Sequence, residues 1–337
     1  MVVDGRDPSA VQRAAQALRA GELLGLPTET VYGLAADAGN DAAVAKIYAA
    51  KGRPPGHPLI VHLADESGTR EALAHFAAEV PAFAWLLMDA FWPGPLTLIL
   101  PRRAGVAATA AGGQDSIGLR CPAHPVAQAV LRAARALGVV GLAAPSANQF
   151  GRVSPTTAAH VQAEFGEGLL ILDGGPCEVG IESTIVDCTR GAPVLLRPGQ
   201  ITRVRIDEVL RAAGTDARLR DQHEIAARTA EAAPRASGTL ESHYAPRAKV
   251  RLMDAGALQL ALQDSPARIA VYARARLTLP AGIVHRPMPT EASAAAYELF
   301  AALRALDEAG VREIWVETPP DAPAWEGVAD RLRRAAA

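Results

Sequence analysis

The sequence predicts two domains: an α+β domain with a mixed sheet over residues 1–205, and a small α/β, Rossmann-like domain over residues 249–337. The chain has 337 residues, about twice the roughly 150 residues of a typical domain. Strand-like runs crowd the first 205 residues without regular alternation, whereas β and α patterns alternate after residue 249. From residue 217 to about residue 246 the sequence lacks clear periodicity and is rich in Ala, Glu, Arg, Pro, Ser and Gly, which predicts a linker between the domains, over 206–248.

In the first domain, short apolar runs bounded by proline or polar residues predict the strands. The first helix, over 9–20, places Val11, Ala14 and Leu18 on one face, with Ser9 as a candidate cap. Further helices are expected over 41–50, 125–137 and 156–165. Strands are expected over 23–26, 59–63, 96–100, 117–120, 141–144, 169–172, 183–187 and 194–197.

In the second domain, strands alternate with helices. The pattern predicts strands over 249–253, 268–272 and 313–317, and helices over 255–262, 291–309 and 325–336. A further helical stretch is expected over 224–233, inside the linker. Because parallel strands need crossover connections, which are usually helices, this order predicts a small parallel sheet with helices on its faces.

The composition excludes several classes of protein. Half of the residues are apolar and 21% are charged, so burial can offset the ordering entropy, and disorder over the whole chain is excluded. The net charge of -2 argues against a globally basic nucleic-acid coat and against a polybasic membrane anchor. A local basic cleft remains open.

Cysteine usage and the N-terminus predict the compartment. Cys121, Cys177 and Cys188 lie far apart and form no Cys-x-x-Cys pair, which favours a reducing compartment over a disulfide framework or a zinc site. The first residues are acidic and polar rather than typical of a signal peptide. No apolar run reaches the roughly 18 residues of a membrane span. We therefore expect a cytoplasmic protein with no membrane partner.

One loop indicates an anion site. In Lys51-Gly52-Arg53-Pro54-Pro55-Gly56-His57, proline and glycine prevent a helix and hold two cations at a nearly fixed separation. Phosphate groups favour such a pair, with lysine as a compact charge and arginine as a bidentate fork. A solvated loop is the alternative. Because only three of the 34 Lys and Arg residues are lysines, we favour the anion site.

Three other motifs place hydroxyl groups beside predicted strands. Thr28-Glu29-Thr30 follows the strand over 23–26, Pro145-Ser146-Ala147-Asn148 follows the strand over 141–144, and Glu182-Ser183 begins the strand over 183–187. Ligands often bind at strand ends of open sheets, although turn and cap chemistry also explains the first motif. Arg120 and Arg197 follow apolar runs directly, where a half-buried charge needs an anion or a carboxylate.

Other kinds of catalytic site have no support in the sequence. It contains no Ser-His-Asp order, no metal-ligand spacing and no dinucleotide fingerprint, so we expect no protein-held metal. The cations and hydroxyl groups together suit a polyanion such as a nucleoside triphosphate.

Six motifs in this order resemble the YrdC-like family in its long, two-domain form, the threonylcarbamoyl-AMP synthases. They are Pro-Thr-Glu-Thr-Val-Tyr-Gly-Leu from Pro27, Lys-Gly-Arg-Pro from Lys51, Trp-Pro-Gly-Pro-Leu-Thr from Trp92, Pro-Ser-Ala-Asn from Pro145, Glu-Ser-Thr-Ile-Val-Asp from Glu182 and Arg-Pro-Gly from Arg197. The run His243-Tyr244-Ala245-Pro246 resembles the linker signature of the long form. The resemblance implies a YrdC-like mixed, twisted sheet with helices as the first domain.

The resemblance also implies a reaction. It is that of a nucleotidyltransferase that converts L-threonine, bicarbonate and ATP, with Mg²⁺, into L-threonylcarbamoyladenylate and pyrophosphate. The product would serve the N6-threonylcarbamoyladenosine modification at position 37 of tRNAs that read ANN codons. The implied partners are therefore downstream tRNA threonylcarbamoyltransferase proteins, with tRNA as a further candidate. No protein nucleophile is needed, so catalysis would consist of positioning and electrostatic stabilisation.

Carried over motif by motif, the resemblance implies three groups of site residues. Lys51 and Arg53 would stabilise the transferring phosphates. ATP would be held by Arg53, His57, Ser116, Ser146, Ser154, Arg197 and Tyr244, the last as a lid that excludes water. Threonine would be held by Thr30, His62, Arg120, Ala144 and Ser183, with Arg120 on its carboxylate.

Two alternatives share this fold. One is a module that binds double-stranded RNA or tRNA, for which a net charge of -2 and few lysines offer little phosphate contact. The other is a carbamoyl-transfer domain of the hydrogenase-maturation type, which would carry zinc-finger cysteines and an acylphosphatase segment, and neither is found in the sequence.

Overall fold

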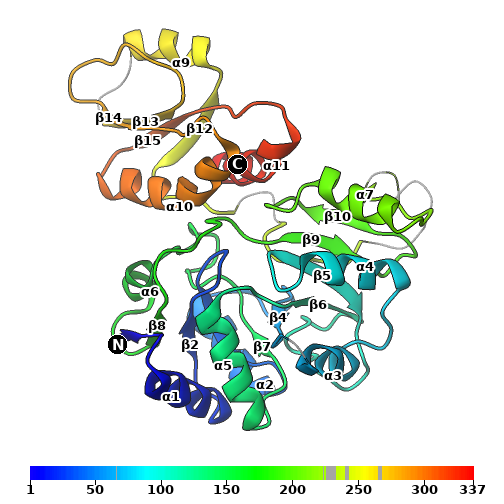
Figure 1. Ribbon diagram of the computed structural model, residues 1–337. Helices are drawn as coiled ribbons and strands as arrows, with labels where there is room; N and C mark the ends of the chain where they lie inside the picture. The colour runs from blue at the N-terminus through cyan, green and yellow to red at the C-terminus, as the bar shows by residue number, and fades with distance from the viewer. Residues whose placement is uncertain (66, 223, 225–232, 240–242, 265–267) are drawn as a thin grey trace.

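The computed structural model describes residues 1–65, 67–222, 224, 233–239, 243–264 and 268–337, which form an 11-stranded sheet and a separate four-stranded sheet. In Figure 1 the smaller, C-terminal sheet lies above the larger one. None of the described helices is long and apolar enough to cross a membrane.

The first sheet is mixed, with the order β1-β8-β2-β3-β7-β4-β6-β5-β9-β10-β11. For example, β4 pairs with β6 in parallel, and β5 pairs with β6 in antiparallel orientation. Its strands are β1 (Val2–Asp4), β2 (Leu24–Leu26), β3 (Gly33–Asp37), β4 (Ile60–His62), β5 (Leu96–Pro101), β6 (Ser116–Arg120), β7 (Leu142–Ala143), β8 (Leu170–Asp173), β9 (Thr184–Asp187), β10 (Val194–Arg197) and β11 (Arg220–Asp221).

Helices contribute to two separate cores against this sheet. α1 (Pro8–Arg19) and α5 (Pro125–Ala136) pack on each other and bury their apolar faces with residues of β2 and β8. The largest core contains residues of α2 (Asp41–Lys51), α3 (Ser67–Phe76), α4 (Ala82–Phe91), α6 (Ala158–Phe165) and α7 (Arg203–Ala212). The cap of α1 is Asp7 rather than Ser9, because Pro8 occupies the first helical position and Asp7 accepts the N–H of Ser9.

The second sheet is parallel, as expected, with the order β12-β15-β13-β14. Its strands are β12 (Lys249–Met253), β13 (Ile269–Ala273), β14 (Val284–Pro287) and β15 (Glu313–Glu317), and its helices are α9 (Ala255–Ala261), α10 (Ala292–Glu308) and α11 (Glu326–Ala336). Short 3-10 turns occupy Leu262–Asp264 and Pro323–Trp325. Neighbouring residues of β13 join different cores: Val271 packs with α9, and Tyr272 with α10 and α11.

All of the helices and strands expected outside the linker are present, with ends displaced by one or two residues. The sequence analysis missed β1, β3, α3, α4, α7, β11 and β14. The expected domain boundary at residue 205 falls inside α7, and β11 pairs with β10, so elements of the first sheet continue to Asp221. The helical stretch expected over 224–233 lies, except for its two ends, outside the described residues.

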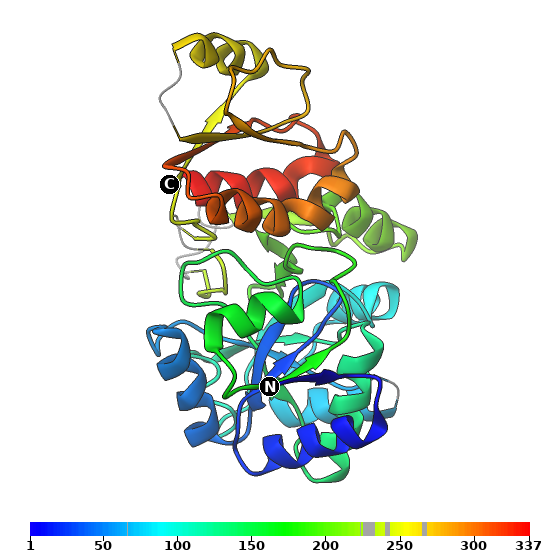
Figure 2. The same cartoon turned by 90° about the vertical axis from the view of Figure 1, so that its left-hand side faces the viewer.

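The two domains pack directly on each other. Figure 2 shows α10 and α11 on the side of the C-terminal sheet that faces the N-terminal domain. Val31, Val153 and Ile181 of the first domain share one core with residues of both helices. Gly180 is required at this contact, because a Cβ there would lie 2.4 Å from the carbonyl oxygen of Ala296 and its φ is +81°. The C-terminal domain thus contacts loops that lead directly into the site motifs.

Candidate active site

A cavity lies where several loops and strand ends of the first sheet meet the linker. Nine of the 13 residues predicted for the site line it: Thr30, Arg53, His62, Arg120, Ala144, Ser146, Ser183, Arg197 and Tyr244. The fold explains this convergence, because His62 and Arg120 are partners in the register of β4 and β6, and Arg197 ends β10. The cavity is small, about 40 Å³, which is room for only a few water molecules.

Arg120 lies at one end of the cavity and is almost fully buried. Its Nη2 is 2.7 Å from Oε1 of Glu29, and its Nη1 donates to the hydroxyl of Thr30 at 2.8 Å. Its Nε donates to the carbonyl oxygen of Gly94. Glu29 is therefore the carboxylate that compensates the buried charge. Since each terminal nitrogen carries two N–H groups, Arg120 has donors beyond those used in these contacts.

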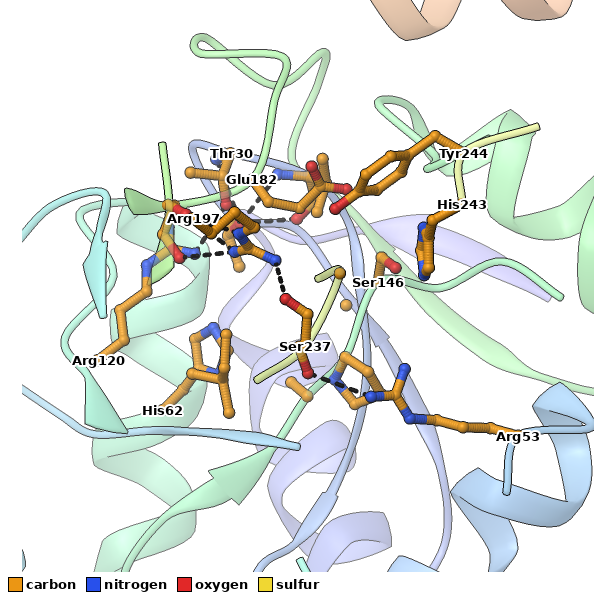
Figure 3. Close-up of a pocket in the computed structure, with 18 residues that line it drawn as sticks. Thr30, Arg53, His62, Arg120, Ser146, Glu182, Arg197, Ser237, His243 and Tyr244 are labelled. Carbon is orange, nitrogen blue, oxygen red and sulfur yellow. Dashed lines mark hydrogen bonds between the residues drawn. The ribbon is translucent and has the colours of Figure 1, made fainter. Parts of the chain in front are cut away.

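His62 lies beside Arg120 and is neutral. Burial, and secondarily the charge of Arg120, lower the pKa of His62 to about 3. Thr30, His62 and Arg120 lie on one side of the view in Figure 3, and Arg53, Ser146 and His243 lie on the other. The first end of the cavity thus offers one cationic donor, a hydroxyl and an uncharged imidazole.

The linker joins two arginines: Arg53, on the second side of the cavity, and Arg197, which lies beside Thr30 and Glu182 in Figure 3. Nη2 of Arg53 donates to the hydroxyl of Ser237 at 3.2 Å, and Nη1 of Arg197 donates to the carbonyl oxygen of the same residue at 2.8 Å. Arg197 also donates to the carbonyl oxygen of Ser183 from Nε and Nη2. Burial lowers the pKa of Arg53 to about 10 and also lowers that of Arg197. Two buried guanidinium groups therefore stand on either side of a short linker segment.

Four predicted residues do not line the cavity, and Lys51 is the most instructive of them. Lys51 is buried at the end of α2, and its Nζ donates to the carbonyl oxygens of Ser146, at 2.6 Å, and Asn148. Burial, and then the charge of Arg53, hold the pKa of Lys51 well below 10.5. In this structure Lys51 supports the loop that carries Ser146.

The other three residues lie close by. The ring of His57 packs edge-on against Phe150, 5.5 Å between centroids. Ser116 lines a second cavity of about 10 Å³, which shares Ile60 and Ser237 with the first. Ser154 is fully buried and donates to Oε1 of Glu182. The linker segment at Ser237 thus separates Ser116 from the main cavity.

The linker signature closes the cavity. Tyr244 is 1% exposed and has a φ of +64°, a left-handed conformation that is rare for a tyrosine and costs free energy. Its ring lies 4.2 Å from the ring of His243 and 5.4 Å from that of Phe300 on α10. Burial raises the pKa of Tyr244 to about 12 and lowers that of His243 to about 3. The packing of the C-terminal domain therefore holds Tyr244 in this unusual backbone conformation.

Comparison with known proteins identifies the family. A family model described as telomere recombination matches residues 16–199, and one described as the C-terminal domain of threonylcarbamoyl-AMP synthase matches residues 201–337. The chain is 37% identical to the threonylcarbamoyl-AMP synthase of Bacillus subtilis, over 98% of this chain and 93% of the relative. It is 35% identical to that of Pyrococcus abyssi, over 96% and 93% of the two chains. The chain belongs to the threonylcarbamoyl-AMP synthase family.

A solved structure agrees with this assignment. The crystal structure of P. abyssi Sua5 complexed with L-threonine matches with a TM-score of 0.85 and 34% identity, covering 100% of this chain and 97% of that one. These matches confirm the family, the two-domain fold and the threonylcarbamoyl-AMP synthase function that the motifs predict. The roles of individual residues stay predictions.

The sequence did not single out several residues of the site, including the following five. Ser237, Gly238, His243 and Glu182 line the cavity, and Glu29 pairs with Arg120. Glu29 and Glu182 lie inside motifs quoted in the sequence analysis. Because a half-buried arginine needs a carboxylate, Glu29 could have been predicted as the partner of Arg120. Ser237 and Gly238 carry no comparable signal, because they lie in a stretch without periodicity.

The synthase's own side chains do not fit a protein-held Mg²⁺. Within the described part of the chain, no group of three or more His, Cys, Asp or Glu residues could hold a metal ion. The carboxylate at the cavity, Glu182, already contacts Ser154 and Arg331. Magnesium prefers oxygen ligands and often takes them from substrate phosphates. We therefore assign no catalytic step to a metal held by the protein.

Proposed function

We propose that this chain condenses L-threonine, bicarbonate and ATP into L-threonylcarbamoyladenylate, pyrophosphate and water in the cavity described above. One observation carries the proposal: a single cavity combines Arg120 and its neighbouring hydroxyl groups with two further buried arginines, Arg53 and Arg197, on either side of Ser237. The surroundings of Arg120 suit an amino acid, and the pair Arg53 and Arg197 suits a triphosphate.

At the first end, Arg120 would bind the threonine carboxylate through N–H groups that it does not use in its contacts with Glu29 and Thr30. The hydroxyls of Thr30 and Ser183, the imidazole of His62 and the backbone at Ala144 would orient the amino acid. Because His62 is uncharged, it would not repel the ammonium group of threonine while that group loses a proton.

The phosphates of ATP would take the place of Ser237 between Arg53 and Arg197. Both guanidinium groups are already oriented and stripped of water, so they would gain more from an anion than exposed arginines would. Ser146 would bind ATP from a loop that Lys51 supports. His57 and Ser154 would contribute from the edges of the site.

The linker has to move before ATP can bind. Cavities of about 40 and 10 Å³ are far below the roughly 300–1,000 Å³ of typical ligand sites. Withdrawal of the segment at Ser237 would join them and bring Ser116 into the ATP site. When the linker closes again, Tyr244 would cover the nucleotide and exclude water from an adenylate that water can hydrolyse.

The chemistry then needs no protein nucleophile. The threonine amine combines with bicarbonate to give a carbamate and water, and a carbamate oxygen attacks the α-phosphorus as pyrophosphate leaves. Arg53 and Arg197 would stabilise the charge that grows on the phosphates, with Lys51 acting from behind the loop. Mg²⁺ would arrive with ATP, held by the phosphates.

The proposed reaction implies the partners and the compartment. The adenylate would pass to downstream tRNA threonylcarbamoyltransferase proteins that modify tRNA, so we expect the chain to act in the cytoplasm. A direct contact with tRNA would be revealed by binding that weakens steeply with salt.

The test is release of pyrophosphate from ATP by the purified chain, with mass-spectrometric detection of the adenylate. We expect release only when threonine and bicarbonate are both present. Turnover without an amino acid, or equal activity with serine and glycine, would contradict the assignment of threonine as substrate.

A further inference from the structure

One arginine of the C-terminal domain reaches into the wall of the cavity. Arg331 on α11 is completely buried, and it contacts residues far along the chain as well as its neighbour Asp330, whose Oδ2 accepts from Nη1 at 3.0 Å. Its Nε donates to Oε2 of Glu182 at 2.9 Å, and its Nη2 donates to the carbonyl oxygen of the same residue at 3.1 Å. Its Nη1 donates to the carbonyl oxygen of Pro198. Arg331 therefore fastens the two segments that bear Ser183 and Arg197.

Glu182 connects this arginine with the site. Glu182 lines the cavity, accepts the hydroxyl of Ser154 at Oε1 and directly precedes Ser183. Burial alone would raise the pKa of Glu182, but Arg331, Arg197 and Ser154 together hold it below its ordinary value. An ionised carboxylate thus forms part of the wall of a cavity that faces two arginines.

A carboxylate in this place is unfavourable for an anionic substrate unless its charge is compensated. ATP carries several negative charges, whereas threonine is a zwitterion with no net charge. Loss of the positive charge at Arg331 would leave Glu182 buried without its ion-pair partner, although Arg197 would still lie near it. The resulting repulsion would fall mainly on the polyanion. The compensating charge comes from the other domain, and Arg331 also lies 5.5 Å from the ring centroid of Tyr244.

We propose that Arg331 is a positioning residue of the ATP site: it neutralises Glu182 and fixes the segments that carry Ser183 and Arg197, so that the C-terminal domain completes the site. This inference rests on the proposed function. It gives the C-terminal domain a direct part in the affinity for ATP.

The test compares Arg331→Met with Arg203→Met. Arg203 also pairs with a residue of α11, Glu326, across the same domain contact, but it does not line the cavity. We expect Arg331→Met to raise the KM for ATP about 10-fold or more and to change the KM for threonine by less than about 3-fold. Arg203→Met should change both constants by less than about 2-fold.

Rescue separates compensation of charge from simple loss of packing. In Glu182→Gln/Arg331→Met, the charge of Glu182 is absent and Asp330 keeps its ion pair with Arg334, so the KM for ATP should return to within about 3-fold of the wild-type value. Arg331→Lys keeps the charge but loses several of the arginine's contacts with Glu182 and Pro198, so its KM for ATP should lie between those of the wild type and Arg331→Met. If Arg331→Met does not fold, the double variant and Arg331→Lys still decide the question.

Four outcomes would overturn the inference. They are equal rises in both KM values, a fall in melting temperature with unchanged kinetics, the same KM split in Arg203→Met, and a double variant as impaired as Arg331→Met. Calorimetric titration with ATP alone gives an independent reading, with about 10-fold weaker binding expected for Arg331→Met. Wild-type protein that binds ATP but releases no threonine-dependent pyrophosphate would instead refute the proposed function.

Discussion

Replacing Lys51 by Met tests the site most directly, because the motif predicts a role with phosphates and the structure adds a role in the loop. Methionine has a similar length and removes the amine, which donates to the carbonyl oxygens of Ser146 and Asn148. Hydrogen bonds from a charged donor contribute about 1.5–3 kcal/mol each. The substitution also removes the desolvation cost of burying the amine of Lys51. The same burial holds the pKa of Lys51 well below 10.5. The net loss of stability is therefore about 1–3 kcal/mol.

The loss of stability and the loss of activity are measured separately. Thermal unfolding should show a midpoint several degrees lower, since about 1 kcal/mol corresponds to about 2–4 °C in a domain of this size. Threonine-dependent pyrophosphate release at saturating substrates should fall about 100-fold, the scale for one electrostatic donor in a transition state. A neutral amine also has two N–H groups, so loss of a proton from Lys51 would not by itself break its contacts with Ser146 and Asn148.

The same helix provides the matched control. Lys46 lies on α2, is partly exposed, and contacts Glu22 and the carbonyl oxygen of Gly21. Lys46→Met should lower stability by less than about 1 kcal/mol and leave turnover unchanged. A folded Lys51→Met protein with wild-type turnover would refute the role of Lys51 in catalysis and leave it as a residue that stabilises the loop.

Three further predictions concern acid stability, the linker and threonine. Burial lowers the pKa of His62 and of His243 from 6.5 to about 3, so each stabilises the fold when neutral, and this contribution is lost as the pH falls from 6.5 towards 3. At pH 5 the loss of folding stability is at most about 2 kcal/mol for each residue. Urea unfolding at pH 7.5 and at pH 5 should show this loss as a lower midpoint at pH 5, and a pH-independent midpoint would contradict the prediction. Gly238 has a φ of +71°, and a Cβ on it would lie 2.8 Å from Nη1 of Arg197. Gly238→Ala should therefore weaken linker closure by about 1 kcal/mol and speed ATP association about 5-fold. An unchanged stopped-flow association rate would argue against the linker as a gate. Arg120→Gln should raise the KM for threonine at least about 10-fold with less effect on ATP, and a larger effect on ATP would reverse the two ends of the cavity.

The sequence predicts the strand ends of the site well, because those signals are local. Proline, glycine and hydroxyl residues directly after apolar runs mark where β2, β7 and β10 end. These are the segments that bring Thr30, Ser146 and Arg197 to the cavity. The motif order supplied the rest of the list, since no spacing rule alone connects residues so far apart.

Contacts between distant segments could not be predicted in this way. Strand β3 consists of Gly33-Leu34-Ala35-Ala36-Asp37 and has no β-branched residue, so its sequence gives no strand signal. It becomes a strand because β2 and β7 flank it. Likewise, the contact between Arg53 and Ser237 spans 184 positions and involves a segment without periodicity.

The distribution of charge explains how the linker can fill the cavity and still yield to ATP. Glu29 and Glu182 are each paired with an arginine, Arg120 and Arg331 respectively, and Arg331 also pairs with Asp330. Arg53 and Arg197, in contrast, contact neutral oxygen atoms, including the hydroxyl and the carbonyl oxygen of Ser237.

Neutral oxygen atoms satisfy the hydrogen bonds of a guanidinium group but leave its charge uncompensated, whereas phosphate satisfies both. The linker is therefore a weaker partner for the two arginines than a triphosphate would be. This difference would let ATP displace the segment at Ser237 without any unfolding of the domains.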